Sequence, residues 1–426
     1  MYRVWNFVTN YSLLLLIGAV LALIWANTNP EAYHDFIEYV LIDDFIIGNP
    51  YVAEDGTIKR TLTLHYLVND VLMAFFFAIA AKEVWEAVIL KNGSLRGRKA
   101  ATPLFATAGG MLGPITVYLG LAMFLGSDVY DAVARGWAIP TATDIAFSYL
   151  VGRVVFGAGH PAVRFLLLLA IADDAAGLII LAVFYPSAEV APEWLLLSFG
   201  SALTAYLLFN WLPLKLDGDD PLRPRSTWVR RKLFVWPYAV AGALSWYGFM
   251  RSGLEPALGL VPVVLAIPHA DRAFGIFSEA EQYLGDLLNR IEHLLKHPVE
   301  IILFFFGLFN AGVQFSSIGA PTWLVLSGLI IGKPLGILIF GWIAAVPLRL
   351  GLPAGMRTID LVVLGCVAAI GFTVSLFVAS VAFDGGTTLE GINVQDAAKM
   401  GALFSFFAAI IALIAGKVFR VEKQPG

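Results

Sequence analysis

Two adjacent aspartates, Asp173 and Asp174, lie in a segment that is otherwise apolar from Phe165 to Phe184. A helix needs roughly 20 apolar residues to cross a bilayer, so this segment is long enough to span one. An ionised carboxylate in the hydrocarbon core is costly, and such residues are rare there and usually mark a path for ions or protons. The aspartate pair therefore predicts an ion-binding site inside a membrane.

The spacing of the two aspartates indicates what this site could do. Neighbouring helical residues point about 100° apart and differ by about 1.5 Å in rise, so the carboxylates share one depth but face different neighbours. Burial and a second nearby carboxylate both favour the protonated acid, so the pair should release protons near neutral pH in coupled steps. Once ionised, it offers the oxygen ligands that a small hard cation prefers. A site that binds either protons or a cation, but not both at once, is the minimum requirement for exchanging one for the other. The alternative is that the two acids pair with a buried base and serve structure alone.

A second polar run, Trp137–Ser148, predicts a helix that is interrupted inside the membrane. Pro140 removes an amide donor and clashes with the preceding turn, while nearby threonine and serine hydroxyls can satisfy the freed backbone groups. Unwound backbone at membrane depth is tolerated only where it is buried in protein or lines a cavity. Asp144 beside the break could neutralise the positive N-terminal end of a half-helix or bind a cation itself. A simple proline kink with a solvated aspartate is the alternative.

A lysine, Lys333, lies inside the apolar run 322–346. A buried lysine needs an acidic partner or must lose its charge, and Asp173 or Asp174 is the natural candidate for that partner. The alternative is that the lysine extends to the membrane surface and has no acidic partner.

Gly371, Thr373 and Ser375 indicate a second interrupted helix, although glycine and serine also serve close helix packing. Each interruption falls in the middle member of a set of three predicted spans, residues 101–185 and residues 322–420. The two sets cross the membrane in opposite directions. This pattern predicts an inverted-topology repeat whose two interrupted helices cross each other.

The composition indicates a membrane protein. Of the 426 residues, 59% are hydrophobic and only 14% are charged, with a mean hydropathy of +0.78, whereas soluble domains have about 25% charged residues. The net charge of −4 does not suggest a nucleic-acid partner. The single cysteine, Cys366, excludes an intramolecular disulfide framework and a cysteine-based metal site, and we expect it to be a small buried residue.

The distribution of apolar runs predicts one all-α polytopic membrane domain, residues 1–426, in a lipid bilayer. The first run is long for a signal peptide and lacks a cleavage site, so we expect a retained helix. About twelve transmembrane helices are predicted, at roughly 11–28, 64–90, 101–125, 131–152, 162–185, 193–212, 229–250, 254–268, 298–314, 322–346, 358–383 and 396–420.

The charges of the loops predict the orientation of the chain. One set of loops contains most of the basic residues, among them Arg153, Arg164, Arg349, Arg357, Lys417 and Arg420. The alternate set is mostly acidic and includes Asp128, Asp131, Glu189 and Glu193. Because cytoplasmic loops carry an excess of Lys and Arg, this alternation places both termini in the cytoplasm.

Two longer loops have patterns of their own. The external loop contains Asp55-Gly56 between short β-prone arms, which predicts a β-hairpin at about 48–60. An isolated hairpin is marginally stable in water, so it should pair with something, for example a second copy of the chain. In the segment 269–297 leucines recur at helical spacing, which predicts an interfacial helix leading into the run 298–314.

Four motifs in the same order resemble the family of NhaA-type sodium/proton antiporters. The motifs are Gly136–Phe147, Asp173-Asp174 in its Ala-Ile-Ala setting, Gly332–Gly336 and Gly371–Thr373, and the likeness runs from the first helix to the twelfth. Antiporters of that family are a standard example of inverted repeats with interrupted helices.

The resemblance implies roles for particular residues. Asp173 and Asp174 would form the cation and proton site, with Asp174 the stronger candidate for the direct Na+ ligand. Thr143 and Asp144 would sit at the crossing of two unwound helices. Lys333 would pair with Asp173 and help to balance the half-helix dipoles.

The resemblance also implies a function. It implies electrogenic exchange of Na+ or Li+ for H+ by alternating access, strongly activated by alkaline pH, which would regulate intracellular pH and sodium. The protein would lie in a bacterial inner membrane, often as a homodimer joined through the external hairpin. It would be no enzyme and would need no cofactor.

Two places depart from the family pattern. Where family members can carry a histidine at the external start of the eighth helix, this chain has Glu255. The cytoplasmic end of the second helix carries an acid, two bases and an acid in the family, whereas Lys82–Glu86 here matches cleanly only at Glu83. An acidic–histidine pair near the ninth helix does match. The candidates for the pH response are therefore Glu83, Glu86, Glu292 and His293, while the pH profile itself is left open.

Two alternative functions make different demands on the sequence. A sodium-coupled carrier of an organic anion would need a wider, more polar cavity and would have less need of two titrating carboxylates on one helix. An intramembrane aspartyl protease would need Tyr-Asp on one helix and Gly-x-Gly-Asp on the next. Tyr130-Asp131 falls at a helix end and no Gly-x-Gly-Asp occurs, which argues against an enzyme.

Overall fold

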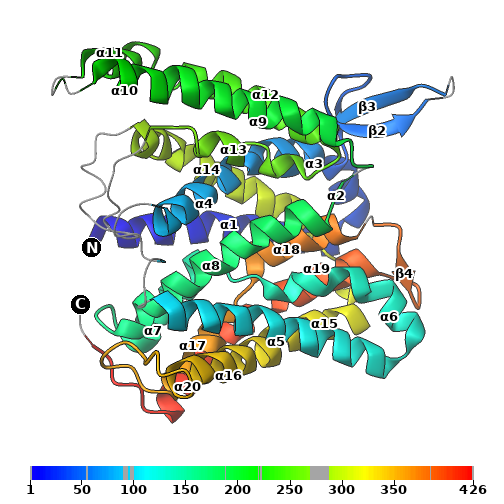
Figure 1. Cartoon of the computed structure of the whole chain (residues 1–426). Helices are drawn as coiled ribbons and strands as arrows, with labels where there is room; N and C mark the ends of the chain where they lie inside the picture. Colours follow the sequence, from blue (N-terminus) through cyan, green and yellow to red (C-terminus); the bar gives the residue numbers. More distant parts are fainter. Residues whose placement is uncertain are drawn as a thin grey trace. The chain divides into compact units, whose positions relative to one another are not determined.

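The protein is predominantly helical, as the sequence predicts (Figure 1). The computed structural model describes residues 2–424 apart from 54–55, 90–94, 96–99, 188, 219, 221–222, 269–286 and 384. The chain forms two compact units, each assembled from segments that are far apart in the sequence. Unit 1 comprises Met1–Tyr33, Ser94–Ile180 and Gly307–Gly426, and unit 2 comprises His34–Gly93 and Leu181–Phe306.

Unit 1 contains both segments that the sequence analysis assigns to the repeat. Its first part consists of α1 (Tyr2–Thr28), α5 (Ala101–Leu125), α6 (Ser127–Val133), the 3₁₀ helix η3 (Ala134–Thr141), α7 (Ile145–Phe156) and most of α8 (Pro161–Phe184). Its second part consists of the end of α14 (Leu287–Asn310), η9 (Phe315–Ser317), α15 (Ala320–Ser327), η10 (Gly328–Gly332), α16 (Lys333–Ala345), α17 (Asp360–Ala368), α18 (Phe372–Ala382), β4 (Thr388–Leu389), β5 (Ile392–Asn393), α19 (Val394–Phe404) and α20 (Phe407–Val418).

Unit 2 contains a small sheet and several helices. After α2 (Pro30–Ile37) come β1 (Val40–Ile42), β2 (Asn49–Val52), β3 (Ile58–Thr63), α3 (Leu64–Tyr66), η1 (Leu67–Leu72) and α4 (Met73–Val88). Later elements are η4 (Pro192–Trp194), α9 (Leu195–Tyr206), η5 (Leu207–Trp211), α10 (Leu212–Asp217), α11 (Pro224–Trp228), η6 (Val229–Leu233), α12 (Trp236–Ser252), η7 (Pro256–Leu258), α13 (Val261–Val264) and the first part of α14.

The predicted hairpin is present, with one more strand than expected. Strands β2 and β3 pair antiparallel, and β1 adds to the other edge of β3, giving the order β1-β3-β2. Asp43 accepts hydrogen bonds from Thr61 at 3.0 Å and Tyr51 at 3.1 Å, and these bonds hold the pKa of Asp43 below its ordinary value. The turn residues Glu54 and Asp55 lie outside the described residues.

The lengths and hydropathies of the helices show a multi-pass membrane protein. In the described part of the chain, six helices are long and apolar enough to cross a bilayer: Leu64–Val88, Ala101–Leu125, Pro161–Phe184, Pro192–Asp217, Ala320–Ala345 and Val394–Val418. A seventh crossing results if α17 and α18, bent by 52° at their junction, form one span. All of these coincide with spans predicted from the sequence.

One predicted span has a different structure. Residues 254–268 form the short η7 and the four-residue α13 in place of a continuous helix. Pro256 and Pro262 lie at the starts of these two pieces, and a proline cannot continue the hydrogen bonding of a helix interior. Of the predicted interfacial segment, 269–286 lies outside the described residues, whereas Leu287 onward is helical and continues into α14 as expected.

Glycines bring α5 and α16 into backbone contact, and the two helices run side by side in unit 1 (Figure 1). A Cβ on Gly109 would lie 2.1 Å from the carbonyl oxygen of Gly336, and one on Gly113 would lie 2.2 Å from that of Gly332. Small residues spaced four apart permit this kind of close approach between membrane helices. The contact fixes the position of Lys333, the first residue of α16.

The first prediction concerns this contact. We expect Gly336→Val to force α5 and α16 apart and to lower stability by about 1–3 kcal/mol or more, as overpacking does. The measurement is thermal unfolding in detergent. The control is Gly120→Val on the other helix of the pair, α5, because a Cβ on Gly120 would meet nothing within 4 Å. Equal losses from the two substitutions would contradict the close contact.

Candidate cation site

The first helix interruption lies where the sequence predicts it. The 3₁₀ helix η3 contains Pro140 and ends at Thr141, and α7 begins at Ile145. Between them the chain is extended, and Asp144 caps α7 by accepting a hydrogen bond from the amide of Phe147 at 3.1 Å.

The second interruption separates α17 from α18. Gly371 precedes α18 and has no room for a side chain, because a Cβ there would lie 2.5 Å from Ser375 Oγ and 3.0 Å from the carbonyl oxygen of Ala142. The latter contact is with the first interruption, so the two unwound segments cross at this glycine.

Hydrogen bonds join the two unwound segments. They run from the Asp144 amide to Ile370 O (2.7 Å), from Thr143 Oγ1 to Ala368 O (3.2 Å), from Ser148 Oγ to Val367 O (3.1 Å) and from Ser375 Oγ to Ile139 O (2.7 Å). Each break thus provides donors for backbone carbonyls of the other break, which is how buried irregular backbone is tolerated.

Asp144 holds the N-terminal ends of both second half-helices. Its Oδ1 accepts from the start of α7, and its Oδ2 accepts from the Thr373 amide at 3.3 Å and from the Thr373 hydroxyl at the start of α18. Helix N-termini carry partial positive charge that favours a carboxylate. Asp144 is buried, so this arrangement provides its counter-charge.

Lys333 lies against Asp173. Its Nζ is 2.9 Å from Asp173 Oδ2 and donates to the carbonyl oxygen of Thr141 at 2.5 Å. The lysine has no exposed surface, which excludes an extension to the membrane surface. Thr141 is the last residue of η3, so the ammonium group also meets the carbonyl end of that half-helix.

The two aspartates differ in environment. Asp173 is buried; its Oδ2 also accepts from Thr143 Oγ1 at 2.6 Å, while its Oδ1 has no hydrogen-bond partner in the described part of the chain. Asp174 is half-buried and lies within electrostatic range of Lys333. One buried oxygen of Asp173 and the half-buried carboxylate of Asp174 are thus the groups suited to accept a proton or to bind a cation.

Two carboxyl groups of the site interact with one buried ammonium group, that of Lys333. Asp173 and Asp174 face one lysine, so a pair that served structure alone would leave one negative charge uncompensated by Lys333. A proton or a cation can neutralise that charge. Among the residues described, no three His, Cys, Asp or Glu side chains come together as a metal site.

The candidates for the pH response lie in unit 2, where Lys82 joins two of them. The lysine is buried, with its Nζ 3.0 Å from Glu86 Oε2 and 2.8 Å from Glu292 Oε2, and it links α4 to α14. Glu83 lies within electrostatic range of this group, whereas His293 is exposed. Sequence reasoning missed Lys82, although its spacing from Glu86 is that of an ion pair on a helix.

The whole sequence is similar to one family of known proteins. The family described as Na+/H+ antiporter 1 matches residues 3–416. The chain belongs to this family. The resemblance inferred from four motifs is thus confirmed.

Relatives named Na(+)/H(+) antiporter NhaA match over nearly their full lengths. That of Jannaschia sp. (strain CCS1) is 72% identical, with 100% of each chain covered. That of Geobacter sulfurreducens is 43% identical with 99% of each covered, and that of Desulfitobacterium hafniense is 45% identical with 98% of this chain and 96% of its own. The structure of the sodium proton antiporter MjNhaP1 from Methanocaldococcus jannaschii aligns with 96% of this chain and 90% of its own at a TM-score of 0.43 and 14% identity, too slight a likeness to support a conclusion.

The second prediction concerns the buried ion pair. Lys333→Ala leaves Asp173 without its cation, and breaking a buried pair costs about 3–5 kcal/mol. We therefore expect a large fall in the melting temperature in detergent. The matched control is Lys59→Ala, which breaks the exposed pair between Lys59 and Asp44 at the same 2.9 Å separation and should cost far less. Similar losses in the two variants would show that burial of the Lys333 pair is not what stabilises it.

Proposed function

We propose that the chain is a secondary active transporter that exchanges Na+, or Li+, for H+ across the membrane by alternating access, with protons and cation competing for Asp173 and Asp174. It is a transporter and not an enzyme. The observation that carries the assignment of the site is the buried contact between Lys333 and Asp173, beside which Asp173 Oδ1 has no hydrogen-bond partner among the described residues and the carboxylate of Asp174 is half-buried.

Each residue of the site has a distinct role in the proposed exchange. Asp174, the more exposed of the pair, is the direct ligand of the transported Na+, and Asp173 shares the site. Thr143 orients Asp173 through its hydroxyl. Lys333 balances the charge of Asp173 and of the carbonyl end of η3. Asp144 holds the crossing together by capping α7 and α18, and we assign it no cation.

The contact distances argue against the alternative of an organic-anion carrier. Lys333, Asp173 and Thr143 are in direct hydrogen-bond contact, at 2.9 and 2.6 Å. Groups that close leave no wide polar cavity between them for an organic carboxylate. A small cation that replaces a proton on a carboxylate oxygen makes no such demand for space.

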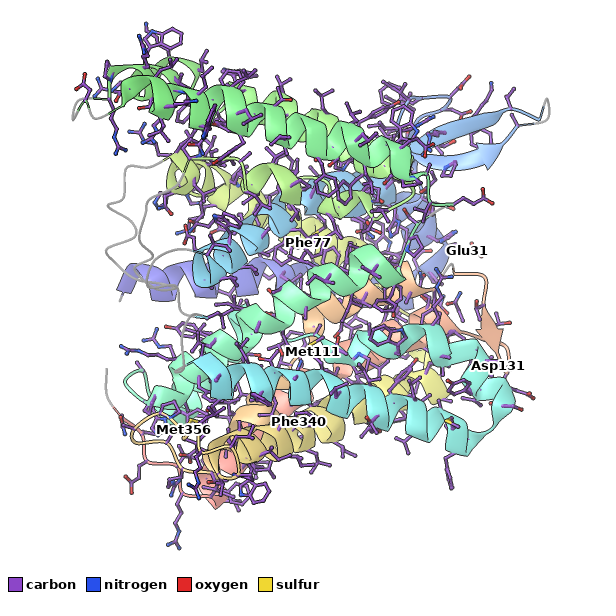
Figure 2. The ribbon with its side chains drawn as sticks, in the orientation of Figure 1. Glu31, Phe77, Met111, Asp131, Phe340 and Met356 are labelled. Carbon is purple, nitrogen blue, oxygen red and sulfur yellow. The ribbon has the colours of Figure 1, made fainter. Side chains whose placement is uncertain are left out.

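We infer that the fold has twelve spans with an inverted repeat and that both termini are cytoplasmic. In support, unit 1 gathers residues of both proposed repeats, each with one interrupted helix. Asp131 and Met356 lie at opposite ends of unit 1 (Figure 2). At the Met356 end, Arg357 donates to the carbonyl oxygen of Arg420, and the amide of Gln424 donates to that of Phe156, so basic loops gather on one side.

We further propose a bacterial inner membrane and a homodimer that forms through the β1-β3-β2 sheet. Apolar side chains on and beside the first strand are exposed: Tyr39, Val40, Leu41, Ile42 and Ile46 have exposed fractions of 41–67%. β1 and β2 are the outer strands of this sheet, and exposed edge strands favour pairing with another chain.

The third prediction tests the exchange itself. Asp174→Asn keeps the shape of the side chain but removes its charge, so Na+-driven proton movement should vanish while the protein still inserts. The measurement is dequenching of a pH-sensitive dye in proteoliposomes on adding Na+, Li+ or K+ in turn. Asp128→Asn, on the exposed start of α6, is the control and should transport normally. Normal turnover of the Asp174 variant would refute the assignment of the site.

A further inference from the structure

A histidine caps the helix that carries the aspartate pair. His160 immediately precedes α8, and its Nδ1 accepts a hydrogen bond from the amide of Ala162 at 3.1 Å. Its ring stacks on Phe156 at the end of α7, with centroids 5.2 Å apart, and only 3% of the residue is exposed. The first amides of a helix lack intrahelical partners, so a side-chain acceptor at this position stabilises the helix start.

The C-terminal residues 421–424 are tied to the same loop. The amide of Gln424 donates to Phe156 O at 3.1 Å, and the amide of Gly159 donates to Gln424 O at 3.1 Å. Gly157 has a φ of +85°, and a Cβ there would lie 2.4 Å from Gln424 O, so only glycine permits this contact.

The start of α17 completes the assembly around His160. Arg357 pairs with Asp360 at 3.0 Å and donates to the carbonyl oxygens of Phe419 and Arg420 at 3.4 and 3.3 Å. The end of α7, the start of α8, the start of α17 and the chain after α20 therefore meet at one end of unit 1.

The helices that meet at His160 lead directly to the candidate site. From this end α7 leads back to Asp144, α17 leads to the second interruption, and α8 leads to Asp173. Their side chains share one buried core that includes Phe156, Leu166 and Leu364. Closely packed elements transmit displacements, so the state of the helix start at His160 affects the geometry of the aspartates.

The hydrogen bond at His160 requires a neutral ring. Because Nδ1 accepts, the single proton of the neutral imidazole lies on Nε2, and the imidazolium has no acceptor left. The charged groups that face the ring are Asp360 and Glu422, which favour its protonation, and Arg357, which opposes it.

Burial is the largest influence on the ring, and it lowers the pKa of His160 below its ordinary value of 6.5. A histidine whose pKa is lowered in the folded state contributes stability that is present above the pKa of the unfolded chain. That stability is lost as the pH falls through the folded-state pKa. Acid therefore removes the cap, and alkali restores it.

We infer that His160 is a positioning residue for the exchange: its neutral ring caps α8 and holds the aspartate pair in the active arrangement, and its protonation releases that arrangement. The inference rests on the proposed exchange at Asp173 and Asp174. Protonation of His160 would lower the maximal rate of exchange, and this effect is separate from the competition between protons and Na+ at the aspartates.

The test uses a cap that does not titrate. Asparagine is among the best N-cap residues, so His160→Asn keeps the acceptor at every pH, whereas His160→Ala removes it at every pH. The measurement is the Na+-driven rate of the full chain in proteoliposomes at saturating Na+, stepped between about pH 6 and about pH 8.5, the range in which histidines titrate. His34→Asn, an exposed histidine on α2, is the control for the substitution itself.

We expect His160→Asn to have the same maximal rate as the parent at alkaline pH. At acid pH its maximal rate should exceed that of the parent by about threefold or more, while the half-saturating Na+ concentration equals that of the parent at each pH. His160→Ala should be slow throughout, by about fivefold. A parent-like pH profile in an active His160→Asn protein would overturn the inference and leave the proposed exchange intact, whereas absence of transport in the parent would reject the exchange.

A second readout keeps the test decisive if His160→Ala does not insert. The melting temperature of the parent in detergent should fall between about pH 8 and about pH 6 by more than that of His160→Asn. Identical falls in the two proteins would also contradict a pH-dependent cap.

Discussion

The structure of unit 1 depends on one buried ion pair, that between Lys333 and Asp173. Neither charge has appreciable contact with solvent, and removing two charges from water is costly unless their geometry is good and their remaining hydrogen-bonding capacity is used. The surroundings meet that condition. Thr141 provides a carbonyl oxygen to the lysine, and Thr143 provides a hydroxyl to the carboxylate. Both groups come from the end of an interrupted helix, and the lysine is brought there by the glycine contact between α5 and α16. The interruptions, the hydroxyl residues and the small residues are thus required by the same pair.

The site separates two tasks that acids can perform at a helix break. Asp144 is saturated by donors from two helix starts and serves the architecture of the crossing. Asp173 keeps one oxygen without a hydrogen-bond partner among the described residues, and Asp174 is half-buried, so we propose that these two exchange their counter-ions. Each carboxylate in a membrane interior must be neutralised. A carboxylate that fixed hydrogen-bond donors already stabilise has less need of a mobile proton or cation, which explains why Asp144 and the aspartate pair have different tasks.

Much of this arrangement could be predicted from the sequence, because charges and prolines in apolar runs have few physical explanations. Asp173, Lys333 and the break at Pro140 were found in that way. Other features depend on contacts between segments that sequence patterns do not relate. These include the third strand β1, the buried Lys82 between Glu86 and Glu292, and the position of His160 against the C-terminal residues. In the segment 254–268, Pro256 and Pro262 were a signal that the helix is broken. The prediction of a continuous span followed the apolar composition of the segment instead.

The central claim is that protons and Na+ occupy the same carboxylates, and the dependence of apparent Na+ affinity on pH tests it most directly. The measurement is half-saturating Na+ in proteoliposomes with equal internal and external pH, stepped from acid to alkaline. Where the site is protonated, each proton that must leave before Na+ binds should weaken apparent affinity about tenfold per pH unit, and two protons about a hundredfold. At higher pH the affinity should become constant. A half-saturating concentration that does not change with pH, accompanied by a pH-dependent maximal rate, would contradict shared occupancy.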